Sequence, residues 1–238
     1  MTDQSAKRKL SLQEAEYRLP VHWLLNKYGL AVYLRKTELM ADMIRQFGTG
    51  GGAALDLGCG DGRGTYELSR LLGASFTFTG IDFSERAIAF ARLMAPDIVF
   101  DVQRGQNLTF EQDSFDLIVA REVIEHIPPE ELNLFLKEAW RVLKPNGKIL
   151  LTTPSEQRRV VEKHFQHFSA RRLIEILEAA TFSVLRVKGF GWWPPCSFES
   201  AYRRLIGLPS LWRIQVLLGS HEMPLKKADS LIVLAEKK

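Results

Sequence analysis

The chain has 238 residues, 46% of them hydrophobic and 25% charged, which predicts one folded globular domain and excludes a disordered chain. The net charge of +4 comes from 32 basic and 28 acidic residues scattered along the sequence, so nucleic-acid binding has no support. Two distant cysteines form no disulfide or zinc pattern, and no signal peptide or long apolar run occurs. We therefore expect a cytoplasmic protein.

The first 49 residues predict a helical cap. Residues 30–47 place apolar side chains at helical spacing, and the glycine run at 48–52 ends that helix. The basic run "AKRKL" at 6–10 indicates a solvated surface. We expect the main domain to occupy residues 50–238.

Within the main domain, short β-rich apolar runs alternate with helical patterns. Strands are expected at 53–57, 76–82, 98–102, 115–120, 148–153, 182–190 and 230–237, and helices at 63–72, 84–94, 129–143 and 169–180. Repeated β-α-β units whose strands are apolar on both faces predict an α/β fold, a Rossmann-like sheet with helices on both sides. An apolar insertion rich in Trp, Pro and Leu at 191–229 breaks this rhythm, and connections of that length tend to be functional.

A glycine-rich stretch, "LDLGCGDGRG", follows the first predicted strand at the place where ligands bind open α/β sheets. A dinucleotide fingerprint counted from Gly58 would need a small residue where Arg63 stands. The carboxylates of Asp56 and Asp61 flank the loop, and two negative charges suit an ammonium or sulfonium better than a pyrophosphate. The loop therefore predicts a positively charged ligand.

Asp82 ends the second predicted strand, 22 residues after Gly60, where an acid accepts hydrogen bonds from both ribose hydroxyls. Together with the loop it indicates a nucleoside that carries a cationic amino-acid tail. At this point the chain resembles the class I S-adenosylmethionine-dependent methyltransferases. The resemblance covers about residues 50–190 and rests on "LDLGCGDGRG", "GIDFSERAIAFA", "NLTFEQDSFDLIVAREVIEHIPP" and "EAWRVLKPNGKILLTTP", in that order.

The resemblance implies a seven-stranded sheet whose last strand is antiparallel, with S-adenosylmethionine as cofactor. It also implies contacts for the cofactor: Asp56 and Gly58 at the methionine amino group, Gly60 and Asp61 at the carboxylate, Asp82 at the ribose, Phe83 at the adenine, and Ala120, Arg121 and Glu122 beside the sulfonium. Cys59 lies within the same loop, where a small packing residue suffices. Relatives usually carry an acid where this chain has Arg104, so Gln103 or backbone groups are expected to contact the adenine amino group instead.

The stretch "AREVIEHIPP" after the fourth predicted strand crowds Glu122, Glu125 and His126 together. Spacings of three and four residues would put them on one side of a helical turn. Three roles stay open: helix capping or packing, a base that orients the acceptor, and a divalent metal site. His126 is the preferred base, with His164 and His167 behind it, and Glu122 is a further catalytic candidate.

The metal alternative rests on a resemblance to the "E-V-x-E-H" of ubiquinone-pathway catechol O-methyltransferases and of small-RNA 3′-end methyltransferases. Its ligands would be Glu122, Glu125, His126 and His164, with His167 as the other candidate histidine. We do not expect a metal, because similar segments in metal-free methyltransferases serve capping and substrate orientation.

The predicted function is methyl transfer from S-adenosylmethionine to a small-molecule or lipid-like acceptor, with oxygen favoured as the acceptor atom. The alternatives are a metal-assisted O-methyltransferase of a catechol or quinone precursor or of an RNA end, and a cofactor-binding relative without catalysis. The apolar N-terminal helices and insertion would cover the acceptor, bring residues 202–218 to a membrane surface, or form a homodimer interface. DNA is not expected as a substrate, because "AREV" replaces the N-P-P-Y-like tetrad of amino-group methylases.

Overall fold

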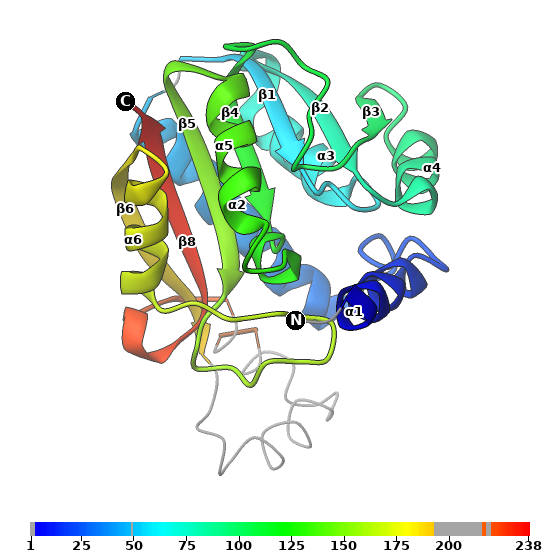
Figure 1. Ribbon diagram of the computed structural model, residues 1–238. Helices are drawn as coiled ribbons and strands as arrows, with labels where there is room; N and C mark the ends of the chain where they lie inside the picture. Colours follow the sequence, from blue (N-terminus) through cyan, green and yellow to red (C-terminus); the bar gives the residue numbers. More distant parts are fainter. Residues whose placement is uncertain (1–2, 49, 193–215, 218–219) are drawn as a thin grey trace.

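The computed structural model describes residues 3–48, 50–192, 216–217 and 220–238, and its centre is an eight-stranded sheet in the order β3-β2-β1-β4-β5-β8-β6-β7 (Figure 1). The strands are β1 (Gly52–Leu57), β2 (Phe76–Asp82), β3 (Val99–Val102), β4 (Phe115–Arg121), β5 (Leu143–Pro154), β6 (Phe182–Trp192), β7 (Glu222–Met223) and β8 (Ala228–Lys237). Strands β3, β2, β1, β4 and β5 are parallel neighbours, and β8 runs antiparallel between β5 and β6.

The predicted mostly parallel sheet is confirmed, but the strand count is a correction. The sheet has eight strands instead of seven, because β7 adds a short antiparallel pairing with Gly189 and Phe190 at the edge. Two residues carry no alternating pattern, so the sequence has no signal for this strand.

Helices cover both faces of the sheet. Figure 1 shows α5 (Leu132–Val142) and α6 (Ala170–Ala179) in front of it, with α2 (Lys27–Gln46) and α3 (Arg63–Leu72) behind. Apolar side chains of α2, among them Met40 and Ile44, are buried with Leu117 and Ile232 of the sheet. Helix α4 (Glu85–Met94) flanks β2 and β3, and α1 (Asp3–Glu16) lies beyond the strand tips, where Lys9 donates to the carbonyl oxygen of His164 at 2.6 Å. The division at residue 49 stays a prediction.

The segment between β4 and α5 differs from the predicted helix over 129–143. A 3-10 turn, Ile124–His126, comes directly after the strand, and α5 begins only at Leu132. Two prolines, at 128 and 129, separate the two elements, because a proline disfavours helical backbone in the residue before it. The crowded acids and histidine are therefore spread around a turn instead of along one side of a helix.

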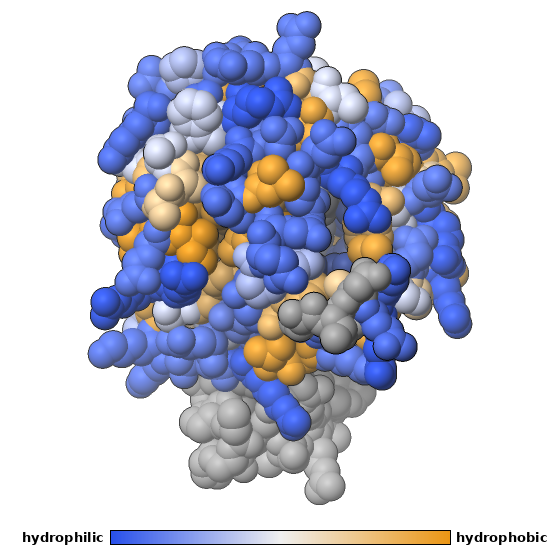
Figure 2. All heavy atoms as spheres, viewed as in Figure 1, coloured by the Kyte–Doolittle hydropathy of each residue, from blue (hydrophilic) through white to orange (hydrophobic). Residues whose placement is uncertain are grey.

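Most of the apolar insertion at 191–229, including Arg203, Arg204 and Arg213, lies outside the described residues, as does the stretch 202–218 except for residues 216 and 217. Among the helices that the structure describes, none has the length and apolar character needed to cross a bilayer. The face seen in Figure 2 is mostly hydrophilic, with separate hydrophobic groups. Membrane contact and a dimer stay predictions.

Candidate active site

A cavity of about 440 Å³ opens at the carboxyl ends of β1, β2 and β4. Its floor comes from the strand ends and its roof from α1, so residues that are more than a hundred positions apart face each other. The lining includes Lys7, Leu10, Gln13, Tyr17, Gly58, Asp82, Phe83, Gln103, Arg104, Glu122, Val123, His126, Phe135 and Phe165. This size lies within the range of small-molecule sites.

The glycine loop after β1 uses left-handed backbone at Gly58 and Gly60, with φ of 77° and 56°. A Cβ at Gly58 would lie 2.6 Å from a Val123 methyl carbon, and a Cβ at Gly60 would lie 2.7 Å from the Tyr17 hydroxyl. Only glycine meets both demands, positive φ and close approach. Of the two glycines, Gly58 lines the cavity, whereas Gly60 is covered by Tyr17 and is not among the lining residues.

Asp82 joins this loop to the end of β2. One carboxylate oxygen accepts a hydrogen bond from the Gly60 N–H at 2.9 Å, and the other accepts one from the Ser84 N–H at 2.9 Å. Each oxygen keeps a second lone pair, which suits the hydroxyls of a ribose. Burial raises the pKa of Asp82 to about 6, against the lowering effect of these N–H groups, so the carboxylate is ionised at neutral pH.

Asp56 lies deeper, at the end of β1. One oxygen accepts a hydrogen bond from the Thr65 hydroxyl at 2.6 Å, whereas Oδ1 is buried with no hydrogen-bond partner in the structure. Burial raises the pKa of Asp56 to about 6, although the Thr65 hydrogen bond opposes it. Asp56 does not line the cavity, but its unpaired carboxylate oxygen beneath the loop fits the ammonium group of a methionine tail, because a buried charge needs a partner.

Asp61 and Cys59 turn away from the cavity. The Asp61 carboxylate accepts hydrogen bonds from the His22 backbone N–H at 2.8 Å and lies 3.1 Å from His22 Nδ1. Cys59 packs in an apolar cluster with Ile88 and Ala91. Asp61 therefore attaches the N-terminal segment to the glycine loop. Its carboxylate would have to keep these hydrogen bonds while it made the predicted contact with the carboxylate end of the methionine tail.

At the adenine end, Phe83, Gln103 and Arg104 all line the cavity. The Gln103 side chain is already occupied, since its amide donates to Asp101 and its carbonyl oxygen accepts from the Thr109 N–H, both at 3.0 Å. Backbone groups are therefore better placed than the Gln103 side chain to receive an adenine amino group.

Ala120 and Arg121 do not line this cavity. Ala120 is buried in the apolar core, and Arg121 points toward α2, where it donates to the Thr37 hydroxyl at 2.8 Å and stacks on the Tyr33 ring. A strand alternates its side chains between the two faces of the sheet, so Ala120 points into the apolar core on one face and Arg121 points toward α2 on the other.

Glu122 does line the cavity, in left-handed backbone with φ of 53°. Its Oε1 lies 2.5 Å from the Lys36 ammonium and accepts a hydrogen bond from the Thr152 hydroxyl at 2.8 Å. Burial alone would raise the pKa of Glu122, but Lys36 and Thr152 lower it to about 2. Glu122 is therefore a fixed negative charge and a weak base.

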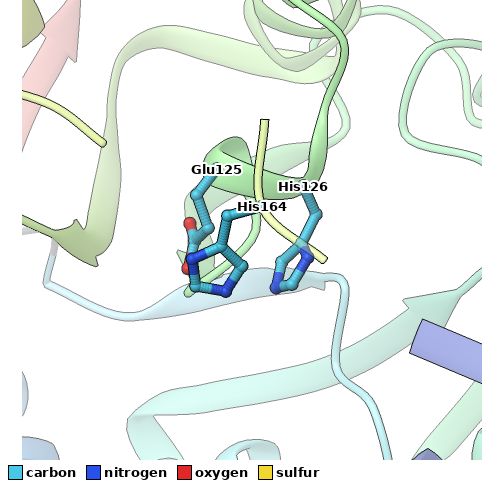
Figure 3. A group of neighbouring side chains, drawn as sticks. All are labelled: Glu125, His126 and His164. Carbon is cyan, nitrogen blue, oxygen red and sulfur yellow. The ribbon is translucent and has the colours of Figure 1, made fainter. Parts of the chain in front are cut away.

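Glu125, His126 and His164 come together in one group (Figure 3). One ligand atom from each lies within 4.8 Å of the others, and Glu122 is not part of this group. The Glu125 carboxyl is fully buried, and burial followed by the charge of Glu122 raises its pKa well above the usual value. Glu125 Oε1 and His126 Nδ1 have no hydrogen-bond partner in the structure.

Both histidines are neutral at physiological pH. Burial, together with the nearby Lys163 ammonium, lowers the pKa of His126 to about 4. Burial lowers the pKa of His164 to about 3. His126 reaches the cavity and can accept a proton, whereas His164 stacks edge-on against it with ring centroids 4.5 Å apart.

Sequence reasoning missed Lys36 and Tyr17. Lys36 sits on α2, where its buried ammonium binds both Glu122 and the Ser230 hydroxyl, at 2.6 Å. Tyr17 lines the cavity, and its hydroxyl lies against Gly60 of the glycine loop. A charged residue on the apolar face of a predicted helix was the available signal for Lys36, but its partners are 86 and 194 residues away.

The profile of a methyltransferase domain family matches residues 49–184, which is more than half of the chain. The chain is similar to the ubiquinone/menaquinone biosynthesis C-methyltransferase of Geotalea daltonii, with 30% identity over 53% of this chain and 55% of that protein. It is also similar to the ubiquinone biosynthesis O-methyltransferase of Xanthomonas oryzae pv. oryzae, with 34% identity over 43% of each. The matches thus span about half the length of these curated relatives.

Solved structures share the fold. Phosphoethanolamine N-methyltransferase 2 of Haemonchus contortus, in complex with S-adenosyl-L-methionine, aligns with a TM-score of 0.60 and 19% identity over 84% of this chain and 52% of that one. An S-adenosylmethionine-dependent methyltransferase from Methanosarcina mazei gives 0.58 and 19% over 82% and 96%. The resemblance seen in the sequence motifs is confirmed, and the chain belongs to the class I S-adenosylmethionine-dependent methyltransferase family.

Proposed function

We propose that this protein transfers a methyl group from S-adenosylmethionine to a hydroxyl group of a small-molecule or lipid-like acceptor. The observation that carries the proposal is that one cavity joins the ribose-binding carboxylate of Asp82 to the neutral imidazole of His126. The named relatives act in quinone biosynthesis, one as a C-methyltransferase and one as an O-methyltransferase, which supports an acceptor of that size and polarity. Leu10, Phe135 and Phe165 add an apolar lining suited to such an acceptor.

The chemistry divides among these residues. S-adenosylmethionine supplies an electrophilic methyl group on a sulfonium sulfur. Asp82 and the glycine loop fix the nucleoside, and Asp56 holds the ammonium of the amino-acid tail. Positioning of this kind supplies most of the rate enhancement in an in-line displacement.

His126 accepts the proton of the acceptor hydroxyl, and its imidazole becomes an imidazolium. The acceptor oxygen would take the methyl group, and the sulfonium of the bound S-adenosylmethionine would become a neutral thioether. The ionised Glu122, on the same wall of the cavity, stabilises both cations, because opposite charges attract strongly where water is scarce.

The test is incubation of the protein with methyl-labelled S-adenosylmethionine and a host extract, followed by identification of the labelled product. We expect an apolar or amphipathic product with an O-methyl ether. Wild type and His126→Gln are compared in parallel. Binding of the cofactor by calorimetry without labelled product from any extract would instead favour a cofactor-binding relative without catalysis.

A second candidate function, metal-assisted O-methylation of a catechol-like compound or an RNA end, is favoured by the unpaired Glu125 Oε1 and His126 Nδ1. Together with His164 they form a mixed oxygen and nitrogen ligand set of the kind that binds borderline divalent ions. Such an ion would polarise the acceptor oxygen. The set fits with Glu122 left out, which differs from the four ligands that the sequence suggested.

Chelation separates the two candidates. If a metal takes part, dialysis against EDTA abolishes methyl transfer, and adding back Mg²⁺, Mn²⁺ or Zn²⁺ restores it. Unchanged activity in EDTA would eliminate the metal-assisted candidate and leave His126 as the base.

A further inference from the structure

His164 and His167 form a hydrogen-bonded pair next to the cavity, on the segment between β5 and α6. His164 Nδ1 lies 2.7 Å from His167 Nε2. His167 Nδ1 in turn lies 2.9 Å from the carbonyl oxygen of Arg158. Three groups therefore form a line that ends on the backbone.

The order of protons along this line follows from its last member. A carbonyl oxygen only accepts hydrogen bonds, so His167 Nδ1 must carry a proton and donate it. In a neutral His167 the Nε2 atom then has a lone pair and must accept. The proton of the next bond consequently belongs to His164 Nδ1, and His164 Nε2 is left without a proton.

Both rings are removed from water, at least in part. His164 is 8% exposed, and His167 is half-buried. Along this line neither ring is hydrogen-bonded to a carboxylate, and removal from water disfavours the charged form of an imidazole.

His164 belongs to the cluster shown in Figure 3. His164 Nδ1 is occupied by His167, so Nε2 is the ring atom of His164 available to Glu125 and His126. The rings of His126 and His164 meet at 86°. A lone pair at this position can accept the proton of a hydroxyl group or bind a cation, whereas an N–H group can do neither.

We infer that His167 is a positioning residue, which fixes the tautomer of His164 so that an unprotonated Nε2 faces Glu125 and His126. The inference deepens the proposed function, because it concerns the same site. Outer partners of this type orient functional histidines, and their loss typically lowers metal affinity or activity by about 10- to 100-fold.

Two variants separate the tautomer from mere packing. His167→Phe keeps an aromatic ring but removes both hydrogen bonds. His167→Gln keeps an acceptor oxygen near the position of Nε2 and an amide N–H that can reach the Arg158 carbonyl. His221→Phe, at an exposed histidine outside the cavity, is the matched control.

The decisive readout is the ¹⁵N spectrum of ring-labelled histidines in the whole 238-residue chain, which distinguishes protonated from lone-pair nitrogens. We expect His164 to carry its proton on Nδ1 in the wild type and in His167→Gln, and to shift toward the Nε2–H form in His167→Phe. Methyl transfer should fall about 10-fold or more in His167→Phe only, with cofactor affinity unchanged.

A proton on Nε2 of His164 in the wild type would overturn the inference, and so would an unchanged His164 spectrum in His167→Phe. The wild-type spectrum decides the question even if the Phe variant does not fold. Because the spectrum requires no turnover, a missing methyltransferase activity with the expected tautomer would count against the proposed function alone.

Discussion

In one half of the site the main hydrogen-bond partners are backbone groups, whereas in the other half they are side chains. In the glycine-loop half, formed by Gly58, Gly60 and Asp82, the Asp82 carboxylate is bound by two backbone N–H groups and the Gly58 N–H by the Ile81 carbonyl. In the histidine half, formed by Glu122 and His126 with Glu125 and His164 behind them, the partners are side chains. Lys36 and Thr152 bind Glu122, Thr153 binds Glu125, and His167 binds His164.

This difference teaches which changes each half should tolerate. A backbone scaffold survives most side-chain replacements but fails at its glycines and its single acid. In a side-chain network, removing one residue also destabilises its neighbours, because a buried polar group that loses its hydrogen-bond partner keeps its desolvation cost. Single substitutions can therefore test the halves separately.

The largest effect is expected in the histidine half. His126→Gln removes the base but not the cofactor cradle, so methyl transfer should fall by roughly 10²- to 10⁴-fold while cofactor affinity stays within about 2-fold. Single-turnover assays with labelled cofactor and calorimetry measure the two quantities. His221→Gln is the control, and a His126 variant of wild-type rate would remove this residue from the chemistry.

The next effect belongs to the glycine-loop half. Asp82→Ala removes the ribose acceptor and leaves the Gly60 and Ser84 N–H groups unpaired, so cofactor affinity should fall by about 100-fold or more. Asp42→Ala, at an exposed aspartate on α2, is the matched control. Equal affinity in the Asp82 variant and the control would contradict the assignment.

Lys36→Met removes the ammonium group that pairs with Glu122 in the histidine half. Glu122, whose pKa is lowered to about 2, contributes stability above its ordinary pKa of 4.5, and this contribution is lost as the pH falls toward about 2. Since 35% of the Glu122 side chain is exposed and water screens the pair, we expect a loss of about 1–3 kcal/mol at pH 7. Denaturant melts should show the gap between wild type and variant closing in acid.

The double variant Lys36→Met with Glu122→Gln sharpens the same test. It removes both charges and should recover part of the lost stability, because no unpaired carboxylate is left. A double variant less stable than the sum of the two single changes would mean that the ion pair itself is not what Lys36 contributes.

The smallest effect is expected at Asp56. Its pKa is raised to about 6, so its buried charge costs stability above that pH, and the cost disappears as the pH falls below 3.8. Asp56→Asn should therefore raise the unfolding free energy at pH 7 by about 1–2 kcal/mol and weaken cofactor binding. The gain in unfolding free energy of the Asn variant over the wild type should be larger at pH 7 than at pH 4. An equal gain at the two pH values would contradict this.

The glycine-loop half was readable from the sequence, because Gly58, Gly60 and Asp82 lie at strand ends whose positions periodicity predicts. Helix α3 and strand β2 have the predicted bounds, residues 63–72 and 76–82. The histidine half was readable only in part. His126 and His164 were named, and His167 lies only three residues from His164, but nothing local indicates that Lys36 binds Glu122, 86 residues away.

The failures have a physical cause. We assumed helical spacing for Glu122, Glu125 and His126, but the structure has a 3-10 turn there, before two prolines. Glu122 lies ahead of this turn and pairs with Lys36. Alternation along β4 turned Arg121 toward α2. Side-chain direction at the end of a strand depends on such tertiary partners, and a single sequence does not contain them.

The most direct test of the whole account is calorimetric titration of S-adenosylmethionine into wild type, Asp82→Ala, Gly60→Val and His126→Gln. We predict one site per chain, with affinity lost in the first two variants and kept in the third. A Val at Gly60 would meet both the positive φ and the Tyr17 hydroxyl. Undiminished affinity in both Asp82→Ala and Gly60→Val would contradict the placement of the cofactor in this cavity.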